Sequence, residues 1–284
     1  MQILNSCHEA IEHCLNQKYF ACGHLYSDDK TMDIHIHDCC EIYYSISGGR
    51  QYLIDNRFYS ISPGDLFFIN PYESHCLTKI DTEIHERIVL SIHPDYLKSL
   101  CTPSTDLEAC FRERGGGFSH RVSLSAEDQN RFLYYVRRIT GSEGYGSDLL
   151  EQAAFLEMMV FLNKRFQNHQ EEPEAEKGSR PQVVDEILSY LHQHIQDPFS
   201  LDDLAAHFFL SSSYLCRIFK SSTGTTIHKY VTAKRITLAK SLLNQGYPVM
   251  EACAQSGFGD YSNFFKAFTK ATGLSPKKYS HFNS

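Results

Sequence analysis

The sequence predicts an α+β protein: an N-terminal antiparallel β-barrel with flanking helices, then an all-α domain with two helix-turn-helix motifs joined by a long helix. Three observations support this fold class. Between His35 and about Ile92, short runs rich in β-branched and aromatic residues alternate with turn signals. Residues 182–284 show helical patterns almost throughout. The stretch 167–181 between them is charged, contains two prolines and a glycine, and lacks apolar periodicity, which predicts a linker.

Size and composition narrow the class of protein. A chain of 284 residues favours two domains, and 42% hydrophobic with 13% aromatic residues exclude a disordered chain. No apolar run approaches the roughly 18–20 residues of a membrane span, so no membrane partner is expected. Ten cysteines without a CxxC pair, together with an N-terminus unlike a signal peptide, favour reduced thiols and a cytoplasmic location.

These patterns give a domain plan. We expect residues 1–170 to form an effector-binding and dimerisation domain, with a barrel at about 20–93 and helices at about 125–168, then a linker at 171–181 and a DNA-binding domain at 182–284. The formal net charge of −7 divides unequally: residues 180–284 hold 11 Lys and Arg against 7 Asp and Glu, a net +4, which leaves −11 for the first part. The acidity therefore does not argue against nucleic acid as a partner of the second domain.

The elements of the first domain follow in order. Residues 1–20 have the apolar spacing of a short amphipathic helix, and at least five strands at roughly ten-residue spacing follow. Ser125 and Ser147 each precede a helical pattern with an acidic first turn and are expected as N-caps. The second of these helices is apolar over most of its circumference. Either a second copy of the chain covers it, giving a homodimer, or the domain's own sheet does.

The second domain contains an internal repeat at an offset of 49 residues. Its matching pairs are Ala205/Ala254, Phe209/Phe258, Ser213/Ser262, Leu215/Phe264, Arg217/Lys266, Phe219/Phe268, Thr223/Thr272 and Gly224/Gly273. Each copy predicts a short helix, a tight turn and a second helix that ends at a glycine. This is the layout of a helix-turn-helix, whose second helix can lie in the major groove of DNA.

The outward face of each second helix carries small polar, cationic and aromatic side chains. These predicted DNA-binding residues are Ser212, Ser213, Cys216, Arg217 and Lys220 in the first copy and Tyr261, Ser262, Phe265 and Lys266 in the second. A merely solvated polar face is the alternative, and a cation at the same place in both copies counts against it. The helix between the copies, of about eighteen residues, spans about 27 Å. That length suits two reading helices about 34 Å apart in successive major grooves.

Two segments of the second domain form a recognisable signature. They are AQSGFGDYSNFFKAFTKATGLSPKKY, which includes Gly257, Phe258, Pro276 and Tyr279, and the earlier LAAHFFLSSSYLCRIFKSSTG. In these residues the sequence resembles the AraC/XylS family of transcription regulators, and the earlier segment resembles that family's first helix-turn-helix. Ser280 and Thr269 depart from the pattern, since basic residues are common at both positions. The resemblance implies a double-stranded DNA operator, contacts from Ser213, Cys216, Arg217, Ser262 and Lys266, and RNA polymerase as a partner if the chain is an activator.

The first domain carries a set of metal-ligating residue types, namely His35, His37, Glu41 and His75. Residues 35, 37 and 41 share parity, so on a strand they face one side, and the set suits Zn, Fe, Mn or Ni. IHIHDCCEIYYSISG and SPGDLFFINPYESH resemble the two cupin motifs, although the second lacks a glycine and an asparagine and is one residue short. The predicted effector pocket consists of these four residues and Tyr43. The candidate metal site consists of the four residues alone. No cofactor is otherwise expected.

The favoured hypothesis is a regulator whose barrel binds a small effector, such as a sugar, and modulates DNA binding. No nucleotide loop, GxSxG motif or nucleophile arrangement is present, so no enzyme activity is expected. The alternatives are a cupin metalloenzyme with an accessory helical domain and a regulator that responds to metal or thiol chemistry through the histidines and Cys39 or Cys76.

Overall fold

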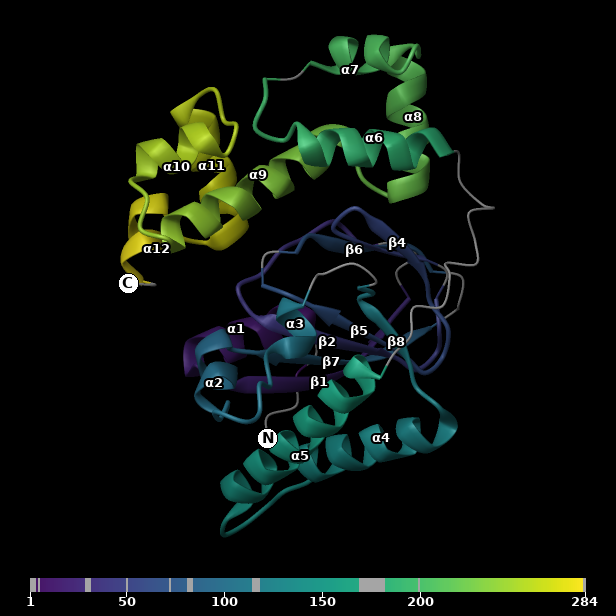
Figure 1. The fold of residues 1–284 in the computed structure, drawn as a ribbon, viewed down its shortest axis with the longest axis vertical. Helices are drawn as coiled ribbons and strands as arrows, with labels where there is room; N and C mark the ends of the chain where they lie inside the picture. Colours follow the sequence, from purple (N-terminus) through teal and green to yellow (C-terminus); the bar gives the residue numbers. More distant parts are fainter. Residues whose placement is uncertain are drawn as a thin grey trace.

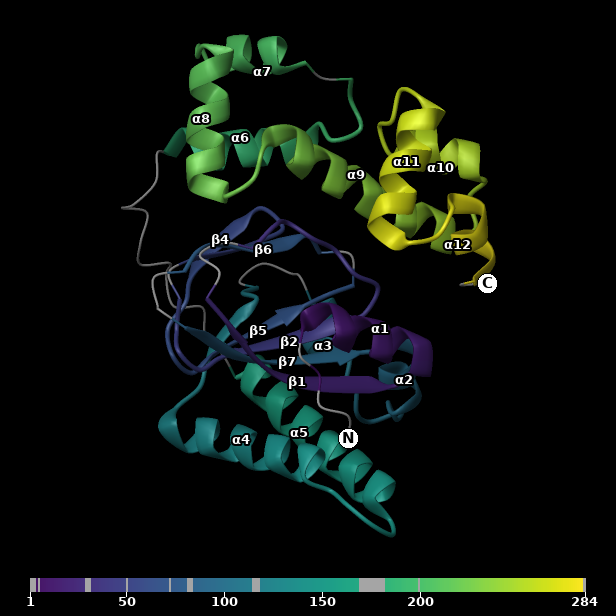
Figure 2. The same cartoon turned by 180° about the vertical axis from the view of Figure 1, so that it is seen from behind.

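A computed structural model of the chain shows a layered N-terminal part and a helical C-terminal part (Figures 1 and 2). It describes residue 4 and the ranges 6–28, 32–49, 51–71, 73–80, 84–113, 118–168, 182–198 and 200–282. The predicted linker at 171–181 lies outside the described residues. Within the described ranges, no helix has the length and hydropathy needed to cross a lipid bilayer.

Two antiparallel sheets form the N-terminal part. The strands are β1 (Phe20–Ser27), β2 (Cys40–Ser45), β3 (Gln51–Ile54), β4 (Arg57–Ser60), β5 (Asp65–Ile69), β6 (His75–Lys79), β7 (His85–Ile92) and β8 (Arg121–Ser123). The larger sheet has the order β1-β7-β2-β5-β8 and the smaller has the order β4-β3-β6. The predicted antiparallel fold is therefore confirmed, with β8 beyond the expected barrel range.

The sheets do not close into the barrel that the sequence predicts. Among the described residues, no strand of one sheet pairs with a strand of the other, so the domain is an open sandwich. One isolated bridge joins His35, in the segment before β2, to His75 on β6. The strands are three to eight residues long.

Strand parity divides the N-terminal core into two layers. Even-numbered residues of β2 and β7, such as Ile42 and Leu90, belong to a cluster that also includes Phe155 and Met159 of α5. Odd-numbered residues such as Tyr43 face the smaller sheet and belong to a second cluster. Alternation along each strand thus places helices on one face of the larger sheet and the sandwich interior on the other.

Helices surround the sheets. In the N-terminal part they are α1 (Cys7–Gln17), α2 (Pro94–Ser99), α3 (Ala109–Arg112), α4 (Ala126–Thr140) and α5 (Ser147–Gln167). The Ser125 hydroxyl accepts a hydrogen bond from the Asp128 amide and caps α4 as predicted. The expected cap of α5 is wrong, because Ser147 is its first residue and Gly146, in the left-handed conformation, precedes it. Buried α5 residues pack on the domain's own sheet, whereas Leu149 and Leu150 are exposed.

The C-terminal part is entirely helical in its described residues. Its helices are α6 (Gln182–Gln193), α7 (Leu201–His207), α8 (Ser212–Thr223), α9 (Ile227–Asn244), α10 (Val249–Gln255), α11 (Tyr261–Thr272) and α12 (Pro276–Phe282). The long helix α9 joins the unit of α6–α8 to the unit of α10–α12, as the sequence predicts (Figure 1).

The two parts of the chain pack against each other through the smaller sheet. Its outward-facing Leu53, Phe58 and Cys76 share a hydrophobic cluster with residues of α6, α8 and α9. Figures 1 and 2 show α4 and α5 on one side of the molecule, the sheets in the middle, and α6, α8 and α9 beyond β4 and β6. The smaller sheet therefore separates the sandwich interior from the helical part.

Candidate functional site

The two candidate reading helices, α8 and α11, are built alike. Side chains of Ser211 and Asp260 cap their first turns, and each helix ends at a glycine in the left-handed conformation. Apolar side chains at i, i+3 and i+4, such as Leu215 and Phe219 in α8, are buried and anchor each helix to its unit. The opposite face of each of these two helices points away from the protein core.

Most of the predicted DNA-binding side chains lie on these outward faces. Exposed residues are Ser213, Arg217, Lys220, Tyr261, Ser262, Phe265 and Lys266. Two others are engaged within the protein: Ser212 donates a 2.6 Å hydrogen bond to Asp202, and Cys216 is half-buried against the core of the first unit. Both are therefore weaker candidates for DNA contact than the exposed seven.

Sequence reasoning missed Tyr214, which lies beside Arg217. The Arg217 guanidinium sits 5.3 Å from the centre of the Tyr214 ring, and the ring is exposed. The aromatic face restricts the arginine and orients it outward. An aromatic residue three positions before a cation on a predicted reading face was the available signal.

The structure corrects the register of the internal repeat. The amide of Leu210 donates to Ala205 O, and the amide of Phe258 donates to Cys253 O, so the first helices match at an offset of 48. The second helices, α8 and α11, match at 49 as predicted. The second turn is thus one residue longer. The predicted pairing of Phe209 with Phe258 is wrong, since Leu210 fills the core position that Phe258 occupies in the other copy.

Phe209 instead occupies the left-handed turn position that Gly257 holds in the second copy. Its φ is 55° against 87° for Gly257, and its side chain is 97% exposed. A left-handed conformation is unfavourable for a residue with a Cβ atom and favours glycine. Phe209 is therefore a strained, outward-facing aromatic residue at the turn before α8.

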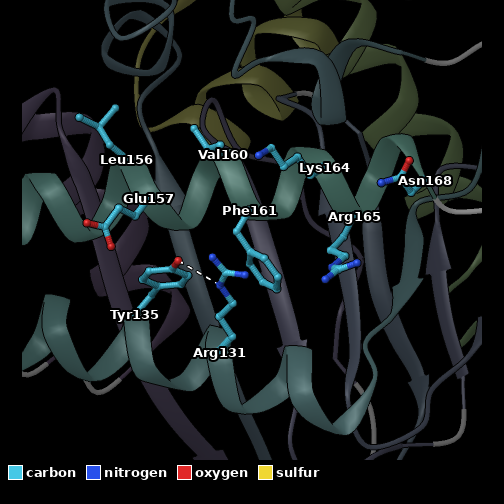
Figure 3. Close-up of a pocket in the computed structure, with 9 residues that line it drawn as sticks. All are labelled: Arg131, Tyr135, Leu156, Glu157, Val160, Phe161, Lys164, Arg165 and Asn168. Atoms are coloured by element: carbon cyan, nitrogen blue, oxygen red, sulfur yellow. Dashed lines mark hydrogen bonds between the residues drawn. The ribbon is translucent and has the colours of Figure 1, made fainter.

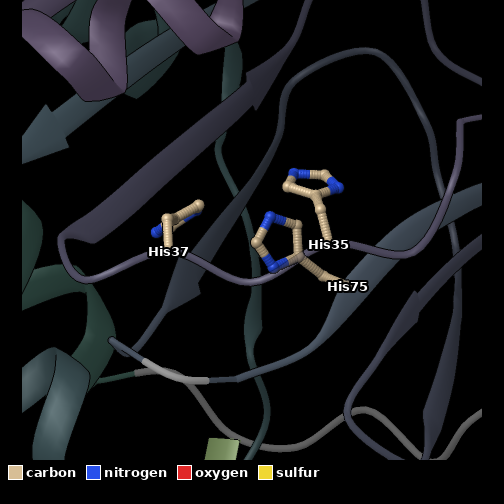
Figure 4. Close-up of side chains that lie close together, drawn as sticks. All are labelled: His35, His37 and His75. Carbon is tan, nitrogen blue, oxygen red and sulfur yellow. The ribbon is translucent and has the colours of Figure 1, made fainter. Parts of the chain in front are cut away.

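The second candidate site is the group of His35, His37 and His75 (Figure 4), together with Glu41. The structure brings these four predicted residues together: one ligand atom from each histidine lies within 4.8 Å of the others. Glu41 Oε2 lies 3.0 Å from His37 Nε2, and Glu41 Oε1 lies 3.8 Å from His75 Nε2. Only His35 is half-buried, and the other three are buried.

Backbone carbonyls fix the orientation of the three imidazoles. The Nδ1 atom of His35 lies 3.0 Å from Asp33 O, that of His37 3.0 Å from Cys39 O, and that of His75 2.9 Å from Glu73 O. A carbonyl only accepts, so each Nδ1 must carry a proton, and a neutral ring then presents its Nε2 lone pair. Metal-binding histidines are held in the same way. His75 Nε2 is buried without a hydrogen-bond partner.

Electrostatics leave two of the rings neutral and one charged. Burial lowers the pKa of His35 and, further, that of His75, and the neighbouring histidines add to both shifts. Burial also disfavours charge on His37, but its hydrogen bond to Glu41 and the negative charge of that carboxylate raise its pKa above the ordinary value. For Glu41, the effect of burial is outweighed by the histidines, which lower the pKa to about 2. A His37–Glu41 ion pair therefore faces two neutral imidazoles.

The cysteines next to this group are poor ligands. Burial raises the pKa of Cys39 well above its ordinary value and that of Cys76 to about 12, so both remain thiols near neutral pH. None of the ten cysteines, all of which lie in the described ranges, forms a disulfide bond. Metal binding at this site would rest on the histidines and the carboxylate.

The sandwich interior also contains polar groups that sequence reasoning missed. The predicted pocket residue Tyr43 forms a 2.6 Å hydrogen bond with His85 Nε2, while Arg87 Nη1 and the Tyr52 hydroxyl are buried without a hydrogen-bond partner. The alternation of side chains along HERIVLSI places His85 and Arg87 on one face of that strand. Only the pairing of β7 with β2 shows that this face lies inside the sandwich. The rings of Tyr43, Tyr52 and Phe67 pack together and fill this interior.

A separate hollow lies on the outer surface of α4 and α5 (Figure 3). It measures about 580 Å³ and combines cationic and apolar side chains. Phe161 lies between two guanidinium groups, 5.1 Å from Arg131 and 5.6 Å from Arg165. The hollow is on the far side of the larger sheet from the histidine group.

Comparisons with known proteins bear on both parts of the chain. A family model described as "AraC-like ligand binding domain" matches residues 17–159, and one described as "Helix-turn-helix domain" matches residues 204–281. The chain is 22% identical over 270 residues to the HTH-type transcriptional activator RhaR of Escherichia coli O139:H28, covering 95% of this chain and 94% of the relative. It is 28% identical over 256 residues to RhaR of Salmonella arizonae, covering 88% and 87%.

Solved structures are similar at lower identity or over a shorter range. ToxT from Vibrio cholerae O395 is 16% identical, with 94% of this chain and 99% of that chain covered and a TM-score of 0.37. The C-terminal domain of AraT, a response regulator from Geobacillus stearothermophilus, is 27% identical, with 37% and 88% covered and a TM-score of 0.35.

Proposed function

The chain belongs to the AraC family of helix-turn-helix transcription regulators, with an AraC-like ligand-binding domain in front, and on that premise we propose that it is a transcriptional activator that reads its operator with α8 and α11. Membership in this family overturns the alternative of a cupin metalloenzyme with an accessory helical domain. The finer proposal rests on one observation: both candidate reading helices present an exposed cation, Arg217 or Lys266, at the same place on their outward faces.

The test of this proposal compares three alanine variants. A duplex is first selected by the full chain from a random-sequence library, and its affinity is then measured at fixed salt. Arg217→Ala and Lys266→Ala should each weaken binding by about 1–3 kcal/mol, or about 5- to 150-fold, if each pairs with a base edge. Lys98→Ala makes the same change of charge on the exposed surface of α2 and serves as the control. Unchanged affinity in both test variants would contradict the assignment of the reading helices.

For the effector, the histidine group favours a divalent cation over the expected sugar. Three oriented imidazoles with a carboxylate fit Zn²⁺ or a similar ion when His37 releases the second ring proton that it carries in its ion pair with Glu41, and the buried Nε2 atom of His75 lacks a hydrogen-bond partner. When bound there, the ion would be held by His35, His37, His75 and Glu41 and would supply fixed positive charge.

A ligand screen on the full chain distinguishes these effector classes. Zn²⁺, Co²⁺, Ni²⁺ and Mn²⁺ are compared with sugars and aromatic acids for a rise in the thermal midpoint. We expect the metal ions to raise the midpoint in the wild type and in His8→Ala, whose histidine is exposed on α1, but not in His35→Ala. A response to sugars alone would instead assign the effector to the interior around Tyr43 and Arg87.

We also propose that the chain forms a homodimer through the outer face of α4 and α5. Large apolar side chains are exposed there and at the adjoining turn, namely Tyr134, Tyr145, Leu149, Leu150 and Val160. The inner face of α5 is covered by its own sheet, so this outer face is what a second copy would cover. RNA polymerase is the further partner that an activator requires.

A further inference from the structure

The hollow on the outer surface of α4 and α5 gathers positive charge in an acidic part of the chain. Arg131 of α4 and Lys164 and Arg165 of α5 line it, together with a single carboxylate, that of Glu157 (Figure 3). Residues 1–179 as a whole carry a net charge of −11. The three cations at the hollow therefore run against the charge of the domain that contains them.

The carboxylates around the hollow are already paired. Glu157 Oε2 lies 2.7 Å from Arg138 Nη1, and Asp128 Oδ1 lies 2.8 Å from Arg165 Nη2. Within the part of the chain that the structure describes, Arg131 and Lys164 form no ion pair. The hollow thus presents two positive charges that the described residues do not neutralise.

Contacts with aromatic rings hold the guanidinium groups over an apolar floor. Those of Arg131 and Arg165 lie 5.1 and 5.6 Å from the centre of the buried Phe161 ring. The Arg131 Nε–H donates a 3.2 Å hydrogen bond to the Tyr135 hydroxyl, which leaves the two Nη groups available for an oxyanion. Val160 adds an aliphatic side chain to the lining. A matching ligand has both an anionic group and an apolar body.

We propose that this hollow binds a small organic anion with an apolar body, such as an aromatic carboxylate. Its volume of about 580 Å³ falls within the roughly 300–1,000 Å³ of small-molecule sites. The anionic group pairs with Arg131 and Lys164, and the apolar body packs beside Val160 and Phe161. Figures 1 and 2 show α4 and α5 on the side of the sheets opposite to the C-terminal helices, so DNA on α8 and α11 of the same chain is not the anion.

Most of the proposed dimer surface lies at the other end of the α4–α5 pair. Leu149 and Leu150 lie in the first turn of α5, whereas Lys164 and Arg165 lie in its last turn, about 21–24 Å further along the helix axis. Of the exposed apolar residues assigned to the dimer, only Val160 also lines the hollow. A second copy that covers the apolar end leaves the cationic end for a ligand.

The experiment titrates the full chain with 2-naphthoate, which joins a carboxylate to a fused aromatic body. The chain contains no tryptophan, so the fluorescence anisotropy of naphthoate reports binding without interference from that residue. We expect saturation at one naphthoate per chain. The neutral isostere 2-naphthamide should displace it at least tenfold less effectively. Acetate, which has the charge without the apolar body, should not displace it over the same concentration range.

Variants of exposed cations locate the site without disturbing the core. Arg131→Gln and Lys164→Glu should each weaken naphthoate binding at least fivefold, because each removes one of the two unpaired charges. Lys164→Arg keeps the charge and should stay within twofold of the wild type. Lys98→Gln removes a cation from the exposed surface of α2 and should have no effect. The thermal midpoint of each variant without ligand checks that it folds.

Three results would overturn the proposal. If naphthoate does not bind, or binds no better than naphthamide, the hollow is not an anion site. Binding that Arg131→Gln and Lys164→Glu both leave unchanged places the ligand elsewhere, for example beside the buried Arg87 of the sandwich interior. If naphthoate does not bind and both variants dissociate a dimer in sedimentation, a second copy of the chain is the occupant. Weaker binding in both variants, with Lys164→Arg close to the wild type, supports the anion site.

Discussion

Replacing Phe209 by glycine should stabilise the protein, although it removes a large aromatic side chain. Phe209 has a φ of 55° and is 97% exposed, so its ring contributes little burial to lose. A left-handed conformation costs a residue with a Cβ atom about 1–2 kcal/mol. Glycine avoids this strain but gives back about 0.5–1 kcal/mol in backbone entropy. The net expectation is a free energy of unfolding raised by about 0.5–1 kcal/mol.

Urea unfolding followed by circular dichroism measures this change, with two comparison variants. Phe209→Ala keeps the Cβ atom and the strain, so its stability should stay near that of the wild type. Gly257→Ala should lose about 1–3 kcal/mol, because a Cβ at this left-handed position would lie 2.7 Å from Ile195 O. A lower stability of Phe209→Gly would refute the reasoning, since Phe209 would then make contacts that this structure lacks.

Three further predictions concern the sensor part. Asn163→Leu should lower the free energy of unfolding by about 2–4 kcal/mol in urea, because it removes the hydrogen bonds that Asn163 makes to the buried Cys110 amide and Leu107 carbonyl; a loss under 1 kcal/mol would contradict this. Burial and the nearby Arg87 lower the pKa of His85 to about 4, so as the pH falls from 6.5 toward 4 the unfolded chain gains a proton that the folded chain resists. As the pH falls, this group should therefore lower the free energy of unfolding by at most about 1.4 kcal/mol per pH unit. His85→Gln should remove that part of the pH dependence, and parallel curves of stability against pH for the wild type and the variant would contradict the prediction. The double variant Leu149→Glu/Leu150→Glu should be monomeric in sedimentation where the wild type is dimeric, and an unchanged dimer would place the interface elsewhere.

The reading helices could be predicted from sequence because their information is local. Caps, apolar stripes and terminal glycines lie within a dozen residues of one another, and the repeat supplied a second copy of each signal. The register of the first helices could not be predicted in the same way. Phe209 and Phe258 are the same residue type at an offset of 49. The second turn is one residue longer, however, so the structural counterpart of Phe209 is Gly257.

The histidine group was also predictable in part. Residues 35, 37 and 41 share parity, and the structure brings them to His75. The other side of the same segment was not predictable. Asp38 and Lys240 are about two hundred positions apart, and no periodicity within either element indicates that they meet. His85 and Arg87 were missed for a related reason, since their side of β7 is defined only by its pairing with β2.

Hydroxyl-radical footprinting of the full chain on its selected duplex tests the central claim most directly. Two reading helices joined by α9 predict two protected stretches of sugar–phosphate backbone per protomer, each flanking a major groove and centred about 10 base pairs apart on one face of the DNA. Arg217→Ala should lose protection at one segment and Lys266→Ala at the other. A single protected segment, or a pattern that neither variant changes, would contradict recognition by α8 and α11.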